Sequence, residues 1–74
     1  MHPVEAQSRF YTELTAALRQ ARNEGPTELG KKMLGRAAGM MDSPQFLEMP
    51  ERDQSELLEF YAIADAEVTG VVAA

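Results

Sequence analysis

Residues 50 to 70 read PERDQSELLEFYAIADAEVTG, and this stretch decides the fold. Pro50 suits the start of a helix, and Glu51 and Asp53 favour the positive end of the helix dipole. Gly70 can adopt the left-handed conformation that ends a helix. At 100° per residue, the large apolar side chains form one stripe: Leu57, Phe60, Tyr61, Ala64 and Val68. The stretch predicts a helix over about 51–69 that organises an all-α domain.

Leu58 and Ile63 fall outside this stripe, one on each side of it. A helix with apolar residues on three sides is usually covered by more than one neighbour. In a chain of 74 residues, one of those neighbours can belong to a second copy. We therefore expect Leu58 and Ile63 to contact a partner protein, with a homo-oligomer as the first candidate.

Length and composition favour one small domain over residues 1–74 that gains stability from tight helix packing or association. A domain of this size buries only about 60% of its unfolded surface. The chain has no cysteine, so neither disulfides nor cysteine-based zinc sites can help it. Its apolar runs are short and its first residues do not resemble a secretory signal, so we expect a soluble, cytoplasmic protein.

The formal net charge of −5 is unevenly distributed. Residues 1–37 hold six basic and four acidic residues, whereas residues 38–74 hold one basic and eight acidic residues. An acidic protein is poorly suited to wrapping nucleic acid, because neutralised phosphates supply most of the non-specific affinity. The pattern favours a basic protein surface as the partner of the second half, or the chain's own basic half.

A helix is also predicted over about 3–23. Pro3 fits a first helical residue, and Gly25 followed by Pro26 marks the end. One face of this segment carries most of its apolar residues: Phe10, Tyr11, Leu14, Ala17, Leu18 and Ala21. Small alanines on that face would let a partner helix approach closely.

The segment 27–41 predicts a helix with an unusual glycine content. Thr27 is a good N-cap, and Leu29, Met33, Ala37, Met40 and Met41 recur at helical spacing. Three further residues, Gly30, Gly35 and Gly39, each cost about 1 kcal/mol relative to alanine. Either the helix breaks near Gly35, or the glycines permit a close approach. On a helical wheel one strip lies away from the methionines and could receive a partner helix: Gly35, Ala38 and Gly39, edged by Lys31 and Lys32.

A short helix over 44–48 connects this segment to the last one, with Ser43 as N-cap and Pro44 in its first turn. We expect Phe46 and either Leu47 or Met49 to cover the end of the bundle. The fold class is thus a three- to four-helix bundle, with residues 71–74 as a tail that could be disordered. The core candidates are Phe10, Leu14, Leu18, Leu29, Met33, Met40, Phe46, Leu57, Phe60, Tyr61, Ala64 and Val68.

No motif predicts an enzyme, a cofactor or a metal site. Gly25 to Lys31 fits G-x-x-x-x-G-K, but Lys32 stands where a phosphate loop has Ser or Thr, and a helix end followed by a helix start explains the same letters. His2 is the only histidine and is close to a terminus. Carboxylates recur at three-residue spacing in Asp53, Glu56 and Glu59, without the Glu-x-x-His motif of helical di-iron sites. A solvated acidic face is the expectation.

Two patterns point toward nucleic acid. Residues 27–36, TELGKKMLGR, resemble the opening of a helix-turn-helix, although AAGMMDSPQF after them has no basic residue. Residues 56–65, ELLEFYAIAD, resemble the E-L-x-x-F-Y-x-x-A-D stretch of the Hha family, small helical bacterial proteins that modulate nucleoid-associated proteins by binding them. That resemblance covers ten residues and implies that Asp65 faces a basic partner. The family's basic first helix and tryptophan-containing C-terminus have no counterpart here.

The sequence favours a non-enzymatic protein–protein interaction module, a small acidic accessory, regulatory or inhibitory protein that self-associates. An alternative is a nucleic-acid-associated regulator that uses Lys31, Lys32 and Arg36, as a degenerate helix-turn-helix or an Hha-like modulator. A third hypothesis is an acidic decoy whose carboxylates imitate phosphates. The candidate partner-binding residues are Leu58, Ile63, Glu56, Glu59, Asp65, Lys31, Lys32, Gly35 and Gly39.

Overall fold

The computed structural model describes residues 3–70, with side chains from Gln7 onward. These residues form four helices, α1 (Pro3–Glu24), α2 (Glu28–Met41), α3 (Pro44–Leu47) and α4 (Glu51–Thr69), and no strand. The all-α class and the helix positions expected from the sequence are confirmed to within one residue at each end. His2 and the expected tail at 71–74 lie outside the described residues.

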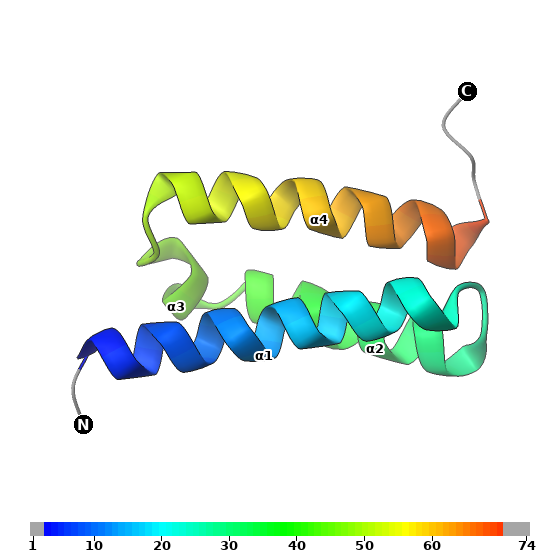
Figure 1. Cartoon of the computed structure of the whole chain (residues 1–74), viewed down its shortest axis with the longest axis horizontal. Coiled ribbons are helices and arrows are strands. Elements are labelled where there is room, and N and C mark those ends of the chain that lie inside the picture. The colour runs from blue at the N-terminus through cyan, green and yellow to red at the C-terminus, as the bar shows by residue number, and fades with distance from the viewer. Residues whose placement is uncertain (1–2, 71–74) are drawn as a thin grey trace.

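The three long helices run up, down and up along the longest dimension of the molecule (Figure 1). α1 and α2 form a hairpin, α3 turns the chain at the far end of α2, and α4 returns antiparallel to α2 (Figure 1). Within residues 3–70, no helix combines the length and apolar character required to cross a bilayer.

The turn between α1 and α2 follows from local backbone chemistry. Gly25 has φ 62°, a left-handed conformation that suits glycine, and its N–H donates to the Ala21 carbonyl at 3.0 Å. Thr27 caps α2 as expected, because its Oγ1 accepts from the Gly30 N–H at 3.0 Å. A Cβ on Gly30 would collide with the Gly25 carbonyl oxygen, so this one glycine of α2 is required by a close approach.

The corner between α2 and α4 differs from the expectation that the Ser43 side chain caps α3. Ser43 occupies the N-cap position of α3, but its hydroxyl donates back to the Met40 carbonyl at 2.6 Å instead of capping α3. Gln54 Nε2 donates to the Met49 carbonyl at 2.7 Å and to the Leu47 carbonyl at 3.2 Å, which fixes the corner to the first turn of α4. At its other end α4 stops at Gly70 in the left-handed conformation, as expected.

The core lies mainly along α1, which packs against both α2 and α4. Seven of the expected core residues are buried: Phe10, Leu14, Leu18, Phe46, Leu57, Ala64 and Val68. Four others pack against the core while partly exposed: Met33, Met40, Phe60 and Tyr61. Met49 is buried and Leu47 is 71% exposed, so Met49 is the residue that joins Phe46 in covering the end of the bundle.

The expectation for Leu29 was wrong. Leu29 is 42% exposed, and Leu34, which the sequence prediction left out, is buried with Ala37 and Gly30. Five residues separate Leu29 from Leu34, so their side chains point about 140° apart on the helix. The tight turn at Gly25 sets Gly30 against the end of α1, and the face of α2 that contains Gly30 and Leu34 therefore turns inward.

Candidate protein-interaction surface

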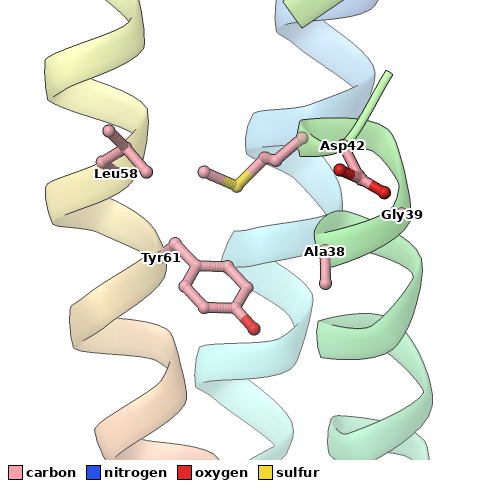
Figure 2. A pocket seen from close by; sticks show the side chains of 6 residues that line it. Ala38, Gly39, Asp42, Leu58 and Tyr61 are labelled. Carbon is pink, nitrogen blue, oxygen red and sulfur yellow. The ribbon is translucent and has the colours of Figure 1, made fainter.

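An open groove of about 560 Å³ runs between α2 and α4. Leu58 and Tyr61 line it from α4, and Ala38, Gly39, Met41 and Asp42 line it from α2. In Figure 2 the Tyr61 ring extends toward the wall that carries Ala38, with the α1 ribbon behind. The groove exists because α2 and α4 both pack on α1 and leave a space between their outer edges. We call this feature the α2/α4 groove.

The walls of the groove are mostly apolar, and one of them has very few side chains. Leu58 is 54% exposed although it neighbours Leu57, which is 1% exposed. On α2, a Cβ placed on Gly35 or Gly39 would meet no atom within 4 Å. The structure thus leaves these two glycines without an intramolecular contact that explains them, and α2 continues through Gly35 without a break. Of the two alternatives expected for this segment, the break near Gly35 is wrong, and the close approach occurs within the chain at Gly30.

The helical wheel placed the glycine strip away from the methionines, but in the structure one methionine shares its wall. Met41 lines the α2/α4 groove together with Ala38 and Gly39. Its position three residues after Ala38 places it about 60° around the helix, near enough to share the same wall. The groove therefore combines a flexible thioether with a flat backbone surface, a composition suited to an adaptable apolar contact.

Leu58 and Ile63 are both exposed, but they do not form one patch. Their exposed fractions are 54% and 48%. Because five residues separate them, their side chains point about 140° apart. Leu58 lies on the flank of α4 that faces the groove, and Ile63 lies on the opposite flank. One partner helix that lies flat on α4 therefore cannot cover both side chains.

The acidic residues of α4 form a solvated outer surface. Glu56 and Glu59 are exposed, and Glu56 Oε1 lies 4.0 Å from Nε of Arg52, an ion pair that is itself exposed. Asp65 is half-buried on the groove side of the helix. Among the described residues, no cluster of three or more His, Cys, Asp or Glu side chains could hold a metal ion.

The basic residues of α2, Lys31, Lys32 and Arg36, are all exposed. Lys31 Nζ lies 3.9 Å from Glu28 Oε1, while Lys32 and Arg36 make no ion pair with any described residue.

The residues after Arg36 complete the same helix and do not start a second one. α3, which follows, has only four residues, so the chain does not place a recognition helix after TELGKKMLGR. Residues 25–31, which fit G-x-x-x-x-G-K, form the turn after α1 and the start of α2.

The sequence prediction identified part of this surface. Leu58 and Gly39, which were expected to contact a partner, both line the groove, and Gly35 lies one helical turn before Gly39 on α2. Asp42, Met41 and Tyr61 also line the groove but were not among the candidates. A signal for Tyr61 was present, because it lies at the edge of the apolar stripe, 40° from Leu57 toward Leu58.

Comparisons with protein-family models, curated proteins and solved structures find no match to this chain. The resemblance to the Hha family therefore rests on the ten residues ELLEFYAIAD alone.

Proposed function

We propose that this protein is a non-enzymatic protein–protein interaction module, a small acidic accessory or regulatory factor that self-associates through α4. The observation that carries the proposal is the exposure of Leu58 beside the mostly apolar α2/α4 groove, in a chain whose core is otherwise well covered. Regulation or inhibition of a partner would follow from occupying this surface.

The energetic argument starts from the size of the chain. A domain of 74 residues has a small core, and its net stability is only a few kcal/mol. Each exposed leucine that becomes covered contributes about 1.5–3 kcal/mol when fully buried. Covering Leu58 and the groove walls would therefore add a substantial fraction of the stability of one chain. Association supplies that cover without a disulfide or a metal.

Self-association can be tested by sedimentation velocity and light scattering from about 1 to 100 µM, since assembly follows mass action. We expect the mass per particle to rise with concentration. Leu58→Gln and Ile63→Gln replace the two exposed aliphatics on opposite flanks of α4 with uncharged polar residues. Leu47→Gln is the control, because Leu47 is equally apolar and 71% exposed on α3. A parent protein that stays strictly monomeric contradicts self-association.

A second candidate function, from a different class, is a nucleic-acid-associated regulator. The observation that favours it is the exposure of Lys31, Lys32 and Arg36 on α2, two of them without an ion pair to any described residue. A gel-shift titration at low salt compares the parent with a variant in which all three residues are replaced by glutamate. Retardation by the parent alone would support this function, because phosphate contacts depend on basic side chains. No retardation by the parent would exclude it.

A further inference from the structure

A row of partly exposed apolar side chains runs along the side of α2 that faces away from the α2/α4 groove. Met33 and the groove residue Asp42 are nine positions apart, so their side chains point about 180° apart. Leu29 is 42% exposed, and Met33 and Met40 pack against the core while partly exposed. The two basic residues beside them are exposed and make no ion pair with any described residue. We call this surface, which spans about 100° of the helix, the α2 stripe: Leu29, Lys32, Met33, Arg36 and Met40.

α4 carries a similar row on its own side away from the groove, with the opposite charge. Ile63 is 48% exposed there, and Phe60 packs against the core while partly exposed. Three exposed glutamates lie beside them. Among the described residues only Glu56 of the three makes an ion pair, with Arg52, so the surface keeps a net charge of about −2. We call this surface, which also spans about 100°, the α4 stripe: Glu56, Glu59, Phe60, Ile63 and Glu67.

α1 borders both stripes, and its exposed residues there are polar. A Cβ on Gly30 would lie 3.4 Å from the Glu24 Cβ, so the flank of α1 that carries Glu24 borders α2. Glu13 and Gln20 share this flank, within about 40° of Glu24. Arg22 points about 160° away from Glu24, on the flank that borders α4. All four polar residues are exposed, so neither flank of α1 continues the apolar part of a stripe.

The α2 stripe and the α4 stripe match each other in both apolar character and charge. Placed together, they set Leu29 and the methionines against Ile63, and they set Lys32 and Arg36 against the glutamates. The α2 stripe on a second α2 stripe would oppose basic residues to basic residues, and two α4 stripes would oppose acidic residues to acidic residues. Either stripe on a flank of α1 would cover Leu29 or Ile63 with polar side chains. Only the pairing of unlike stripes satisfies both requirements.

This pairing has a consequence for the form of the assembly. The two stripes lie on different sides of one chain, so a contact between them joins unlike surfaces of two copies. A contact of this heterologous kind leaves one stripe of each copy uncovered, and further copies can add until a ring closes or an open chain grows. A two-fold dimer, which uses the same surface twice, does not form this contact.

We propose that copies of this chain associate head to tail, with the α2 stripe of one copy packed on the α4 stripe of the next. Ile63 is then covered by the apolar residues of the α2 stripe, and Lys32 and Arg36 gain carboxylate partners. This inference rests on the proposed self-association and names the two surfaces that meet.

Two complementary variants test the pairing, because each disables one stripe and leaves the other intact. Leu29→Glu adds a carboxylate to the stripe that should meet the glutamates of α4. Ile63→Lys adds an ammonium group to the stripe that should meet Lys32 and Arg36. Each variant alone should be monomeric in sedimentation velocity at concentrations where the parent assembles. An equimolar mixture should form a one-to-one complex and nothing larger, since only one intact stripe of each kind remains in the pair.

Controls separate this effect from a general change in charge or a loss of folding. Leu47→Glu and Leu47→Lys make the same substitutions at a residue that is 71% exposed on α3, outside both stripes, and should assemble as the parent does. Arg36→Glu changes only an exposed charge of the α2 stripe and should weaken assembly roughly tenfold at low salt. Mixed with Ile63→Lys, it should form the same one-to-one complex. Circular dichroism checks that each variant keeps the helix content of the parent.

The outcomes separate this inference from the proposed function. If the parent assembles and neither Leu29→Glu nor Ile63→Lys weakens its assembly, self-association stands through another surface and the pairing of stripes is wrong. If only one of the two variants loses assembly, or if their mixture stays monomeric, the stripes do not meet each other and the pairing is again wrong. A parent that remains monomeric throughout the concentration range contradicts both the proposed self-association and this inference.

Discussion

Each of α2 and α4 has a closed side against α1 and an open side away from it. Leucine occurs on both sides of α4, and glycine occurs on both sides of α2. On the closed side, Leu57 is 1% exposed and Gly30 has no room for a Cβ. On the open side, Leu58 is 54% exposed and Gly35 has open space around it. The leucine pair and the glycine pair thus provide matched positions that differ in environment and not in chemistry.

The comparison teaches that the fold of one chain explains only the closed side. Leu57 and Gly30 are required for the helices to pack on α1. Leu58 and Gly35 contribute little to that packing, and a glycine inside an exposed helix costs about 1 kcal/mol relative to alanine. The open side is therefore the part of the molecule whose composition calls for a second explanation, which the proposed self-association would supply.

The largest expected difference is between the two leucines. Leu57→Ala should lower the free energy of unfolding by about 2–5 kcal/mol, because it leaves a cavity beside α1. Leu58→Ala should change it by no more than about 0.5 kcal/mol, because its side chain is half exposed. Urea denaturation followed by circular dichroism measures both, at a protein concentration low enough to keep the chain monomeric. Equal losses for the two variants would mean that the two sides do not differ.

The glycines give the next largest effect. Gly30→Ala should destabilise the chain by about 1–3 kcal/mol, because the new Cβ collides with the Gly25 carbonyl oxygen and the backbone must shift. Thermal denaturation of the variant beside the parent measures this loss. An alanine at Gly30 that is tolerated without loss would show that the turn between α1 and α2 is looser than the structure indicates.

Most of the fold could be predicted from the sequence because its helix ends are set by local chemistry. Gly25 with Pro26, Thr27, Pro50 and Gly70 act within a few residues of their own positions, and the structure places helix ends at each of them. The buried face of α2 was less predictable. Periodicity gives weight to large apolar residues, whereas the contact between α1 and α2 depends on the smallest one, Gly30. Leu29 was assigned to the core because it is a large apolar residue at helical spacing.

The candidate surface was only partly predictable. Leu58 and Ile63 could be recognised as surplus apolar residues of one helix. The α2/α4 groove could not, because it depends on how far α2 and α4 diverge on α1, and no local pattern encodes this separation. Asp42, which is exposed directly after α2, is part of the surface only through its position across the groove from Leu58.

A smaller loss is expected at the start of α2. Thr27→Ala removes the hydroxyl that accepts from the Gly30 N–H, and loss of an N-cap costs about 1 kcal/mol. Thr12→Ala is the matched control, since the Thr12 hydroxyl donates to the Ser8 carbonyl within α1 and caps nothing. Chemical denaturation of the two variants should show a loss for Thr27→Ala alone. A similar loss in both would indicate a general effect of removing a threonine.

The smallest expected effect is a gain in stability instead of a loss, and it tests the open side of α2 directly. Gly35→Ala should raise the free energy of unfolding of the monomer by about 0.4–1 kcal/mol, because it reduces the freedom of the unfolded chain while the helix already has space for a methyl group. The measurement is urea denaturation at two protein concentrations. At the lower one the gain should appear in full, and at the higher one it should shrink if the methyl group holds the copies apart. A loss of stability at the lower concentration would show that the space beside Gly35 is already filled within one chain, and the two sides of α2 would then be alike.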